Sequence, residues 1–442
     1  MKLMKLALLG GAALAVTAAG AQADDLSTLK AEIEALNARV AQLEATPSVP
    51  NGYSLMTYST GEATVVPGNQ PSYLGKNSVV KGFSDRAHVI GVLPTADAPP
   101  STTIEWSGYV YAIVAYADYS YQDYYNGYFD HGDTNVSIIS QAQLKVVGKT
   151  DTAVGEVGVR IQLRSRRQGV SATGDNSHGP RGLFYANEYW GWWAMTPELT
   201  FGGGYSGSLG NIGYGMDGAC NCWWTDWFSS SSSSYRTGNF DGSYDPGNAP
   251  QVRLSWKSGP IGFAVALEEG DSFSYFGQGD LAVAGEITFS GDTINGEVSA
   301  IAYESNDIDG ASDDPDFDHS GWQVGGGIGF GLGDIANVSL AAAVGDEPAR
   351  GGYWGVSGLV SFGLTDTVSA EAGANWKTWD DASGDDDLLE VLAGIYYNPV
   401  SQLTFGLEAE WADLPTGLNA LGTDSFSGED LVVFDFVSIW RF

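Results

Sequence analysis

The chain has 442 residues, of which 54 are acidic and 20 are basic, so its formal net charge is −34 at pH 7. This excess of negative charge excludes nucleic acid as a partner, because a phosphate backbone binds basic surfaces. The mean hydropathy of −0.10 does not exclude a membrane protein, because strands that alternate apolar and polar residues average to a value near zero.

Residues 1–23 have the pattern of a secretory signal peptide. Lys2 and Lys5 precede an apolar stretch, and the sequence AQA ends at Ala23. We therefore expect the mature chain to begin near Asp24 and to be exported. No later stretch offers 18 consecutive apolar residues, so a transmembrane helix is not predicted.

Residues 24–45 carry the heptad pattern of a short coiled coil. Its core positions alternate in steps of three and four residues: Leu26, Leu29, Ile33, Leu36, Val40 and Leu43. The stretch from Arg39 to Glu44 resembles the Arg-apolar-x-x-apolar-Glu signature of three-stranded coils, so we expect a parallel homotrimer. The alternative is an amphipathic helix that lies on its own chain, because fewer than three heptads are marginally stable alone.

Residues 46–102 are predicted to form a Pro/Gly-rich linker. They contain seven prolines and show no sustained periodicity. Two short apolar pieces, which begin at Ser54 and His88, indicate that the linker docks on another part of the chain. The sequence leaves open whether it docks at the base of the following domain or inside it.

From residue 103 onward the chain repeats runs of about ten residues with alternating character, separated by alternately short and long connections. We count sixteen such runs in residues 103–442. Only a closed sheet can pair all of its backbone groups inside a bilayer. The pattern therefore predicts an all-β fold, a sixteen-stranded antiparallel transmembrane β-barrel preceded by the coiled-coil helix. An exported barrel belongs in the outer membrane, with its short turns and the coiled coil in the periplasm.

One predicted strand carries a row of arginines that alternates with apolar residues. An arginine that faces lipid near the bilayer midplane costs roughly 2 to 4 kcal/mol, so we expect this row to face the lumen. Neighbouring strands add further basic residues, and the predicted pore-lining set is Lys145, Arg160, Arg164, Arg166 and Arg253. The alternative is that these side chains pair with nearby acids and fill a narrow barrel.

The longest predicted connection, residues 206–248, far exceeds the length of a usual hairpin loop. Besides tryptophans and a serine run, it contains four aspartates: Asp217, Asp226, Asp241 and Asp245. Folded inward, the loop would narrow the channel and place acidic side chains opposite the basic wall. We therefore predict that it is a constriction loop.

No metal, cofactor or catalytic site is predicted. Cys220 and Cys222 lie close enough to form a small, strained disulfide, or they could bridge to another chain. The four histidines are distant from them in sequence, which disfavours zinc. The nearest approach to a G-x-S-x-G nucleophile motif, at residues 204–208, has its second glycine one residue too early. We therefore do not expect an enzyme.

The last predicted strand, residues 430–442, presents a row of apolar side chains on one face. This row consists of Val432, Phe434, Phe436, Trp440 and Phe442. An edge strand of a soluble sandwich would carry polar residues there instead. A terminal aromatic residue on such a strand is typical of outer-membrane barrels, so we expect Phe442 to be the signal that the barrel-assembly machinery recognises.

The signal peptide, the strand count, the long third loop, Phe442 and residues 250–270 together resemble alphaproteobacterial porins. The resemblance covers roughly residues 103–442. It implies a homotrimeric channel for passive diffusion of small hydrophilic solutes and ions, with the third loop as the constriction. The acidic loops, residues 306–320 and 380–387, would contact lipopolysaccharide through divalent cations.

The coiled coil and the linker depart from the shortest porins. They leave open a second function, a trimeric structural anchor between the outer membrane and the cell wall. A plugged barrel would favour the anchor and an open one the channel.

Overall fold

The computed structural model describes the strands of the predicted barrel and two short pieces before it. The described residues are 54–62, 86–93, 101–119, 135–168, 185–216, 248–269, 281–304, 320–333, 335–347, 351–380, 387–413, 417–418, 425–426 and 430–442. The predicted signal peptide, the coiled-coil core positions, Cys220 and Cys222 lie outside these residues, as do the acidic loop segments 306–319 and 381–386.

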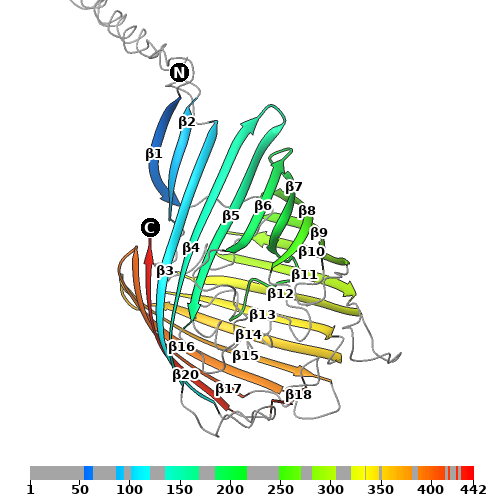
Figure 1. Cartoon of the computed structure of the whole chain (residues 1–442). Coiled ribbons are helices and arrows are strands. Elements are labelled where there is room, and N and C mark those ends of the chain that lie inside the picture. Colours follow the sequence, from blue (N-terminus) through cyan, green and yellow to red (C-terminus); the bar gives the residue numbers. More distant parts are fainter. Residues whose placement is uncertain are drawn as a thin grey trace, which may run out of the picture. The chain divides into compact units, whose positions relative to one another are not determined.

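The regular elements of the described part are all β-strands (Figure 1). They are β1 (Leu55–Glu62), β2 (Arg86–Leu93), β3 (Thr102–Tyr119), β4 (Asn135–Thr152), β5 (Gly155–Gln168), β6 (Tyr185–Ala194), β7 (Leu199–Gly207), β8 (Asn248–Ser258), β9 (Ile261–Glu269), β10 (Leu281–Ser290), β11 (Ile294–Glu304), β12 (Ser320–Leu332), β13 (Ala336–Glu347), β14 (Gly351–Gly363), β15 (Val368–Trp379), β16 (Asp387–Val400), β17 (Leu403–Asp413), β18 (Gly417–Leu418), β19 (Ser425–Phe426) and β20 (Asp430–Arg441). Among the described residues, no helix reaches the length and apolar character needed to cross a membrane.

Sixteen of these strands form a closed antiparallel barrel, as predicted. Each strand from β3 to β16 pairs with the next strand in the chain, β17 pairs with β20, and β20 pairs with β3 (Figure 1). The short connections follow the even-numbered strands β4 to β16, and they include the two-residue turns 259–260 and 401–402. Because the strands alternate in direction, all of these short connections lie at the same end of the barrel.

Side chains alternate between an outer apolar row and an inner row of small and polar residues. On β9, Val265 and Leu267 are exposed, whereas Ala266 and Glu268 between and beside them are buried. On β5, Val159 is 54% exposed and Arg160 is 8% exposed. A strand sends successive side chains to opposite faces, so the exposed row faces outward and the covered row faces the lumen.

Two strands occur within the segment predicted as a linker. The apolar pieces that begin near Ser54 and His88 form parts of β1 and β2, which pair with each other, and β2 also pairs with β3. All seven prolines of residues 46–102 lie outside these two strands, so the strand residues retain the N–H groups that ladder hydrogen bonds require. Residues 57–91 belong to the same compact unit as residues 101–442.

Candidate functional site

The connection after β7 turns into the barrel and lies on its inner wall. Its described part, residues 208–216, includes the buried side chains of Leu209, Ile212, Tyr214 and Met216. The side chains that contact it come from the inner rows of β9 and of β11 to β16. Residues 208–216 are named the inward segment below.

Carboxylates of the wall bind the first half of the inward segment. The Leu209 backbone N–H donates to Glu268 Oε1 at 2.9 Å, and the Gly213 N–H donates to Glu297 Oε1. These amides have no strand partner, and a buried N–H without an acceptor costs about 1 to 3 kcal/mol. The two glutamates on β9 and β11 therefore stabilise an irregular backbone that apolar side chains would leave unsatisfied.

Hydroxyl and amide side chains of the wall bind three further backbone groups of the inward segment. The Gly215 N–H donates to Ser339 Oγ at 2.8 Å, and the Met216 N–H donates to Ser357 Oγ at 2.7 Å. In the other direction, Gln323 Nε2 donates to the carbonyl oxygen of Gly210 at 2.8 Å. The inward segment thus crosses the wall from β9 to β14, with a bonded side chain on most of the strands that it passes.

Small residues in the wall make room for the side chains of the inward segment. A Cβ atom at Gly325 would lie 2.1 Å from Ile212 Cδ1, and a Cβ atom at Gly327 would lie 2.1 Å from Tyr214 Cβ. Real Cβ atoms do not approach other atoms so closely. The two glycines of β12 therefore form a depression that accepts Ile212 and Tyr214. Further buried contacts form one apolar cluster of Ile212, Tyr214, Met216, Ala341, Ala343, Tyr353, Leu359, Trp379, Leu388 and Leu392.

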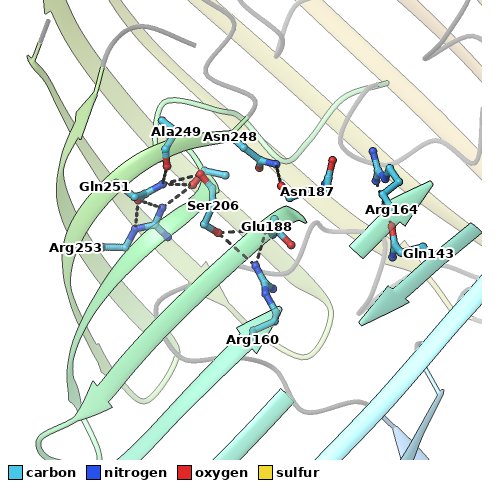
Figure 2. A network of polar contacts seen from close by, with 11 residues as sticks. Gln143, Arg160, Arg164, Asn187, Glu188, Ser206, Asn248, Ala249, Gln251 and Arg253 are labelled. Atoms are coloured by element: carbon cyan, nitrogen blue, oxygen red, sulfur yellow. Dashed lines mark hydrogen bonds and ion pairs between the residues drawn. The ribbon is translucent and has the colours of Figure 1, made fainter. Parts of the chain in front are cut away.

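A basic residue holds the point at which the chain leaves β7 (Figure 2). Arg253 Nη2 donates to the carbonyl oxygen of Gly207 at 2.7 Å and to Gln251 Oε1 at 2.6 Å. Gln251 Nε2 in turn donates to the carbonyl oxygen of Ser206 at 2.8 Å. The guanidinium carbon lies 5.3 Å from the centroid of the Trp190 ring, a favourable cation–π distance.

Arg160 forms a buried ion pair close to the same point. Its Nη2 lies 2.5 Å from Glu188 Oε1 and 3.3 Å from Ser206 Oγ, and the Ser206 hydroxyl also donates to Glu188 Oε1 at 3.2 Å (Figure 2). The two charged side chains are 9% and 15% exposed. Arg160 and Arg253 are therefore bonded to the wall and to the start of the loop.

Two other predicted basic residues are less covered. Lys145 on β4 and Arg164 on β5 are half-buried on the inner rows, and Arg164 Nη2 donates to Gln143 Oε1 at 3.3 Å (Figure 2). Tyr109 donates its hydroxyl hydrogen to the same Gln143 oxygen at 3.0 Å. Of the remaining predicted site residues, the side chain of Arg166 lies outside the described part of the chain, as do Asp217, Asp226, Asp241 and Asp245.

An acidic side of the inner wall, which was not predicted from the sequence, lies on the inner rows of β9 to β20. It consists of Glu268, Glu286, Glu297, Glu371, Glu390, Glu408, Glu410 and Asp435. The acidic residues were expected mainly in loops. Their position in alternating runs was the available signal, since Glu408 and Glu410 share a row with Thr404 and Gly406. The basic residues of the described wall are instead concentrated on β4 to β8, apart from Lys377 on β15 and Arg441 on β20, so the two sides of the wall differ in their balance of charge.

Replacing Arg253 with methionine is expected to loosen the inward segment. The change keeps the bulk of the side chain but removes the hydrogen bonds to Gly207 and Gln251, and a bond to a charged group contributes about 1.5 to 3 kcal/mol. Amide hydrogen exchange in residues 209–216, measured by mass spectrometry, should accelerate about tenfold or more. Lys257→Met, at an exposed position on the same strand, is the control and should leave the exchange unchanged. Equal exchange in both variants would show that Arg253 does not hold the segment.

Comparisons with known proteins support this architecture. No protein-family model and no curated protein sequence matches the chain. The outer membrane channel DcaP of Acinetobacter baumannii is similar in structure, with a TM-score of 0.54 and 15% sequence identity over 77% of this chain and 98% of DcaP. OmpF of Salmonella typhi, solved with daunomycin, gives a TM-score of 0.55 and 11% identity over 76% of this chain and 98% of OmpF.

OprB of Pseudomonas putida shows the same likeness, with a TM-score of 0.51 and 12% identity over 77% of this chain and 94% of OprB. At these identities the similarity establishes the fold and not the activity. The chain therefore has the sixteen-stranded barrel fold of these proteins, whose full length it nearly covers.

Proposed function

We propose that this protein is an outer-membrane porin, a water-filled channel through which small hydrophilic solutes and ions diffuse passively. The observation that carries the proposal is the inward segment, which lies on the inner wall of a closed barrel with an apolar outside. A loop that is bonded to the wall narrows the lumen while leaving the space beside it open to water. The likeness to DcaP, which is described as an outer membrane channel, supports the same function.

The charges of the inner wall suggest how the channel sorts solutes. Lys145 and Arg164 lie on the basic side, and the acidic side faces the lumen from β9 to β20. Charges separated by less than a Debye length, about 8 Å at physiological salt, are only partly screened from each other. A transverse field would orient dipolar and zwitterionic solutes and slow apolar ones, because ordered water must be displaced. Arg166 and the four loop aspartates, Asp217, Asp226, Asp241 and Asp245, are proposed to add to this field.

The assembly follows from the same proposal. The protein would be a homotrimer in the outer membrane, with the coiled coil of residues 24–45 joining three chains in the periplasm. Phe442 would serve as the signal for the barrel-assembly machinery, and the acidic loops would meet lipopolysaccharide through divalent cations. Chemical cross-linking of the protein in outer-membrane vesicles tests the trimer directly.

Recording from purified protein in a planar lipid bilayer tests the function. Stepwise conductance, in groups of three for a trimer, is the expected result. A silent protein that remains folded would contradict the porin proposal and favour the structural anchor. Lipid hydrolysis in a parallel assay would instead indicate an enzyme.

Removing the two half-buried basic residues is expected to change ion selectivity. In the double variant Lys145→Gln and Arg164→Gln, the cation-to-anion permeability ratio should rise about twofold for each charge removed, because a unit charge about 8 Å away in water contributes roughly 0.5 kcal/mol. The reversal potential in a salt gradient measures this ratio. Lys257→Gln removes an exposed charge near the turn after β8 and should produce a smaller change. An unchanged reversal potential in the double variant would place both residues away from the ion path.

A further inference from the structure

The strand that closes the barrel covers only part of the edge of β3. Arg441 of β20 pairs with Tyr109, and the Phe442 N–H donates to the carbonyl oxygen of Gly108 at 3.1 Å. Strand β3 begins earlier, at Thr102, and pairs with β4 from that residue onward. Residues 102–107 therefore have one edge that β20 does not reach.

Strand β2 occupies this edge. It pairs with β3, while β4 holds one edge of β3 along residues 102–117 and β20 holds the other edge along residues 109–119. A strand has only two edges, so the part before Tyr109 is what remains for β2 (Figure 1). Strand β1 pairs with the far side of β2. The barrel seam is thus extended by two strands from a segment that precedes the barrel in sequence.

A stack of four rings joins this extension to the end of β20. The centroid of the His88 imidazole on β2 lies 5.9 Å from that of Trp106, 6.4 Å from that of Phe442 and 6.0 Å from that of Tyr58. All three pairs are stacked, with interplanar angles between 16° and 24°. His88 Nδ1 also lies 2.7 Å from the Tyr58 hydroxyl oxygen. His88 is therefore the one member of this stack that contacts β1, β3 and the end of the chain.

A glycine on β3 lets the last ring lie across the strand. A Cβ atom at Gly108 would be 2.6 Å from Phe442 Cζ, so any other residue there would displace the ring. The ring is held between this glycine and His88, and it is still 49% exposed. The position of Phe442 thus depends on the β1–β2 pair as well as on β20.

We infer that strands β1 and β2 form an intramolecular clamp on the barrel seam, with His88 as the positioning residue that holds Trp106 of β3 and Phe442 together. The segment that contains β1 and β2 would then help to keep the barrel closed, in addition to connecting the barrel to the coiled coil. The junction of β20 with β3 is where the two ends of the sheet meet, so the barrel is closed only while these two strands stay paired. The clamp covers this junction. The inference is independent of transport through the lumen.

Amide hydrogen exchange in the full chain tests the clamp. In His88→Ala, peptides from residues 102–108 and 430–442 should exchange about tenfold faster, since the variant loses three ring contacts, while peptides from β12 and β13 should be unchanged. His88→Phe keeps a flat ring in the stack and should restore most of the protection. Met56→Ala, at a 68% exposed position on β1, is the control and should match the native protein.

Faster exchange confined to β1 and β2, with native exchange in residues 430–442, would overturn the inference. Strands β1 and β2 would then contact the β20–β3 junction without stabilising it. Equal protection in His88→Ala and the native protein would overturn it as well. Should His88→Ala fail to fold, Tyr58→Ala removes an outer ring and leaves His88 in place. That variant should accelerate exchange of residues 430–442 to a smaller extent, and native exchange there would count against the clamp.

Discussion

Replacing Gly327 with valine is expected to raise the single-channel conductance about twofold, because conduction is limited by the narrowest part of a pore. The new Cβ would lie 2.1 Å from Tyr214 Cβ, so either β12 or the inward segment must move. Strand β12 is held by eleven paired residues on each side, whereas the inward segment is held by a few side-chain bonds. The segment should therefore lose its bonds to the wall, and without them it can swing out of the lumen and leave the narrowest part wider.

The matched control is Gly285→Val on β10. A Cβ atom there has Ala264 O as its nearest neighbour, at 3.6 Å, which is an ordinary contact. The control should fold and conduct like the native protein. A folded Gly327→Val protein with native conductance would show that the inward segment does not limit ion flow, and the constriction would have to be sought elsewhere in the lumen.

Replacing Arg160 with methionine is expected to lower the free energy of unfolding by about 3 to 5 kcal/mol, because it leaves the Glu188 carboxylate buried without its partner. The pair is 2.5 Å apart and mostly covered, and the Ser206 hydroxyl also donates to Glu188 Oε1. Adding Glu188→Gln removes the orphaned charge and should recover part of the loss. Urea unfolding in lipid vesicles measures all four members of this double-mutant cycle.

The chain offers a second ion pair for comparison. Lys149 Nζ and Glu156 Oε2 lie 3.9 Å apart, and both side chains are about a quarter exposed, at 25% and 26%. Solvent screening makes such a pair worth about 0 to 1 kcal/mol, so Lys149→Met should have a small effect. If the losses from Arg160→Met and Glu188→Gln simply add, the two side chains are not coupled and the expected mechanism is wrong.

The barrel was predictable because its signals are local. Each strand carries its own alternation, as in Val159 and Arg160, and the cost of an arginine in lipid determines which face is inside. Sixteen weak signals of one kind then predict a closed sheet. Length alone marked the connection after β7 as unusual.

The position of the inward segment was not predictable, because it depends on strands that are distant in sequence. Nothing near Met216 indicates that its amide will bond to Ser357. The need for glycine at positions 325 and 327 becomes clear only when the inward segment is seen to pack against them. The clamp at His88 was missed for a similar reason. Its partner is an edge of β3 that becomes available only because β20 ends early.

The contact between Met216 and Ser357 also constrains the order in which parts of the barrel fold. Its partners lie 141 positions apart, and seven further strands, β8 to β14, must be aligned before the serine is in place. Long-range contacts form late, since the entropy cost of closing the intervening chain comes first. The inward segment is consequently fixed in its final position only after β14 has joined the sheet, so the narrowing of the lumen is among the last features of the barrel to form.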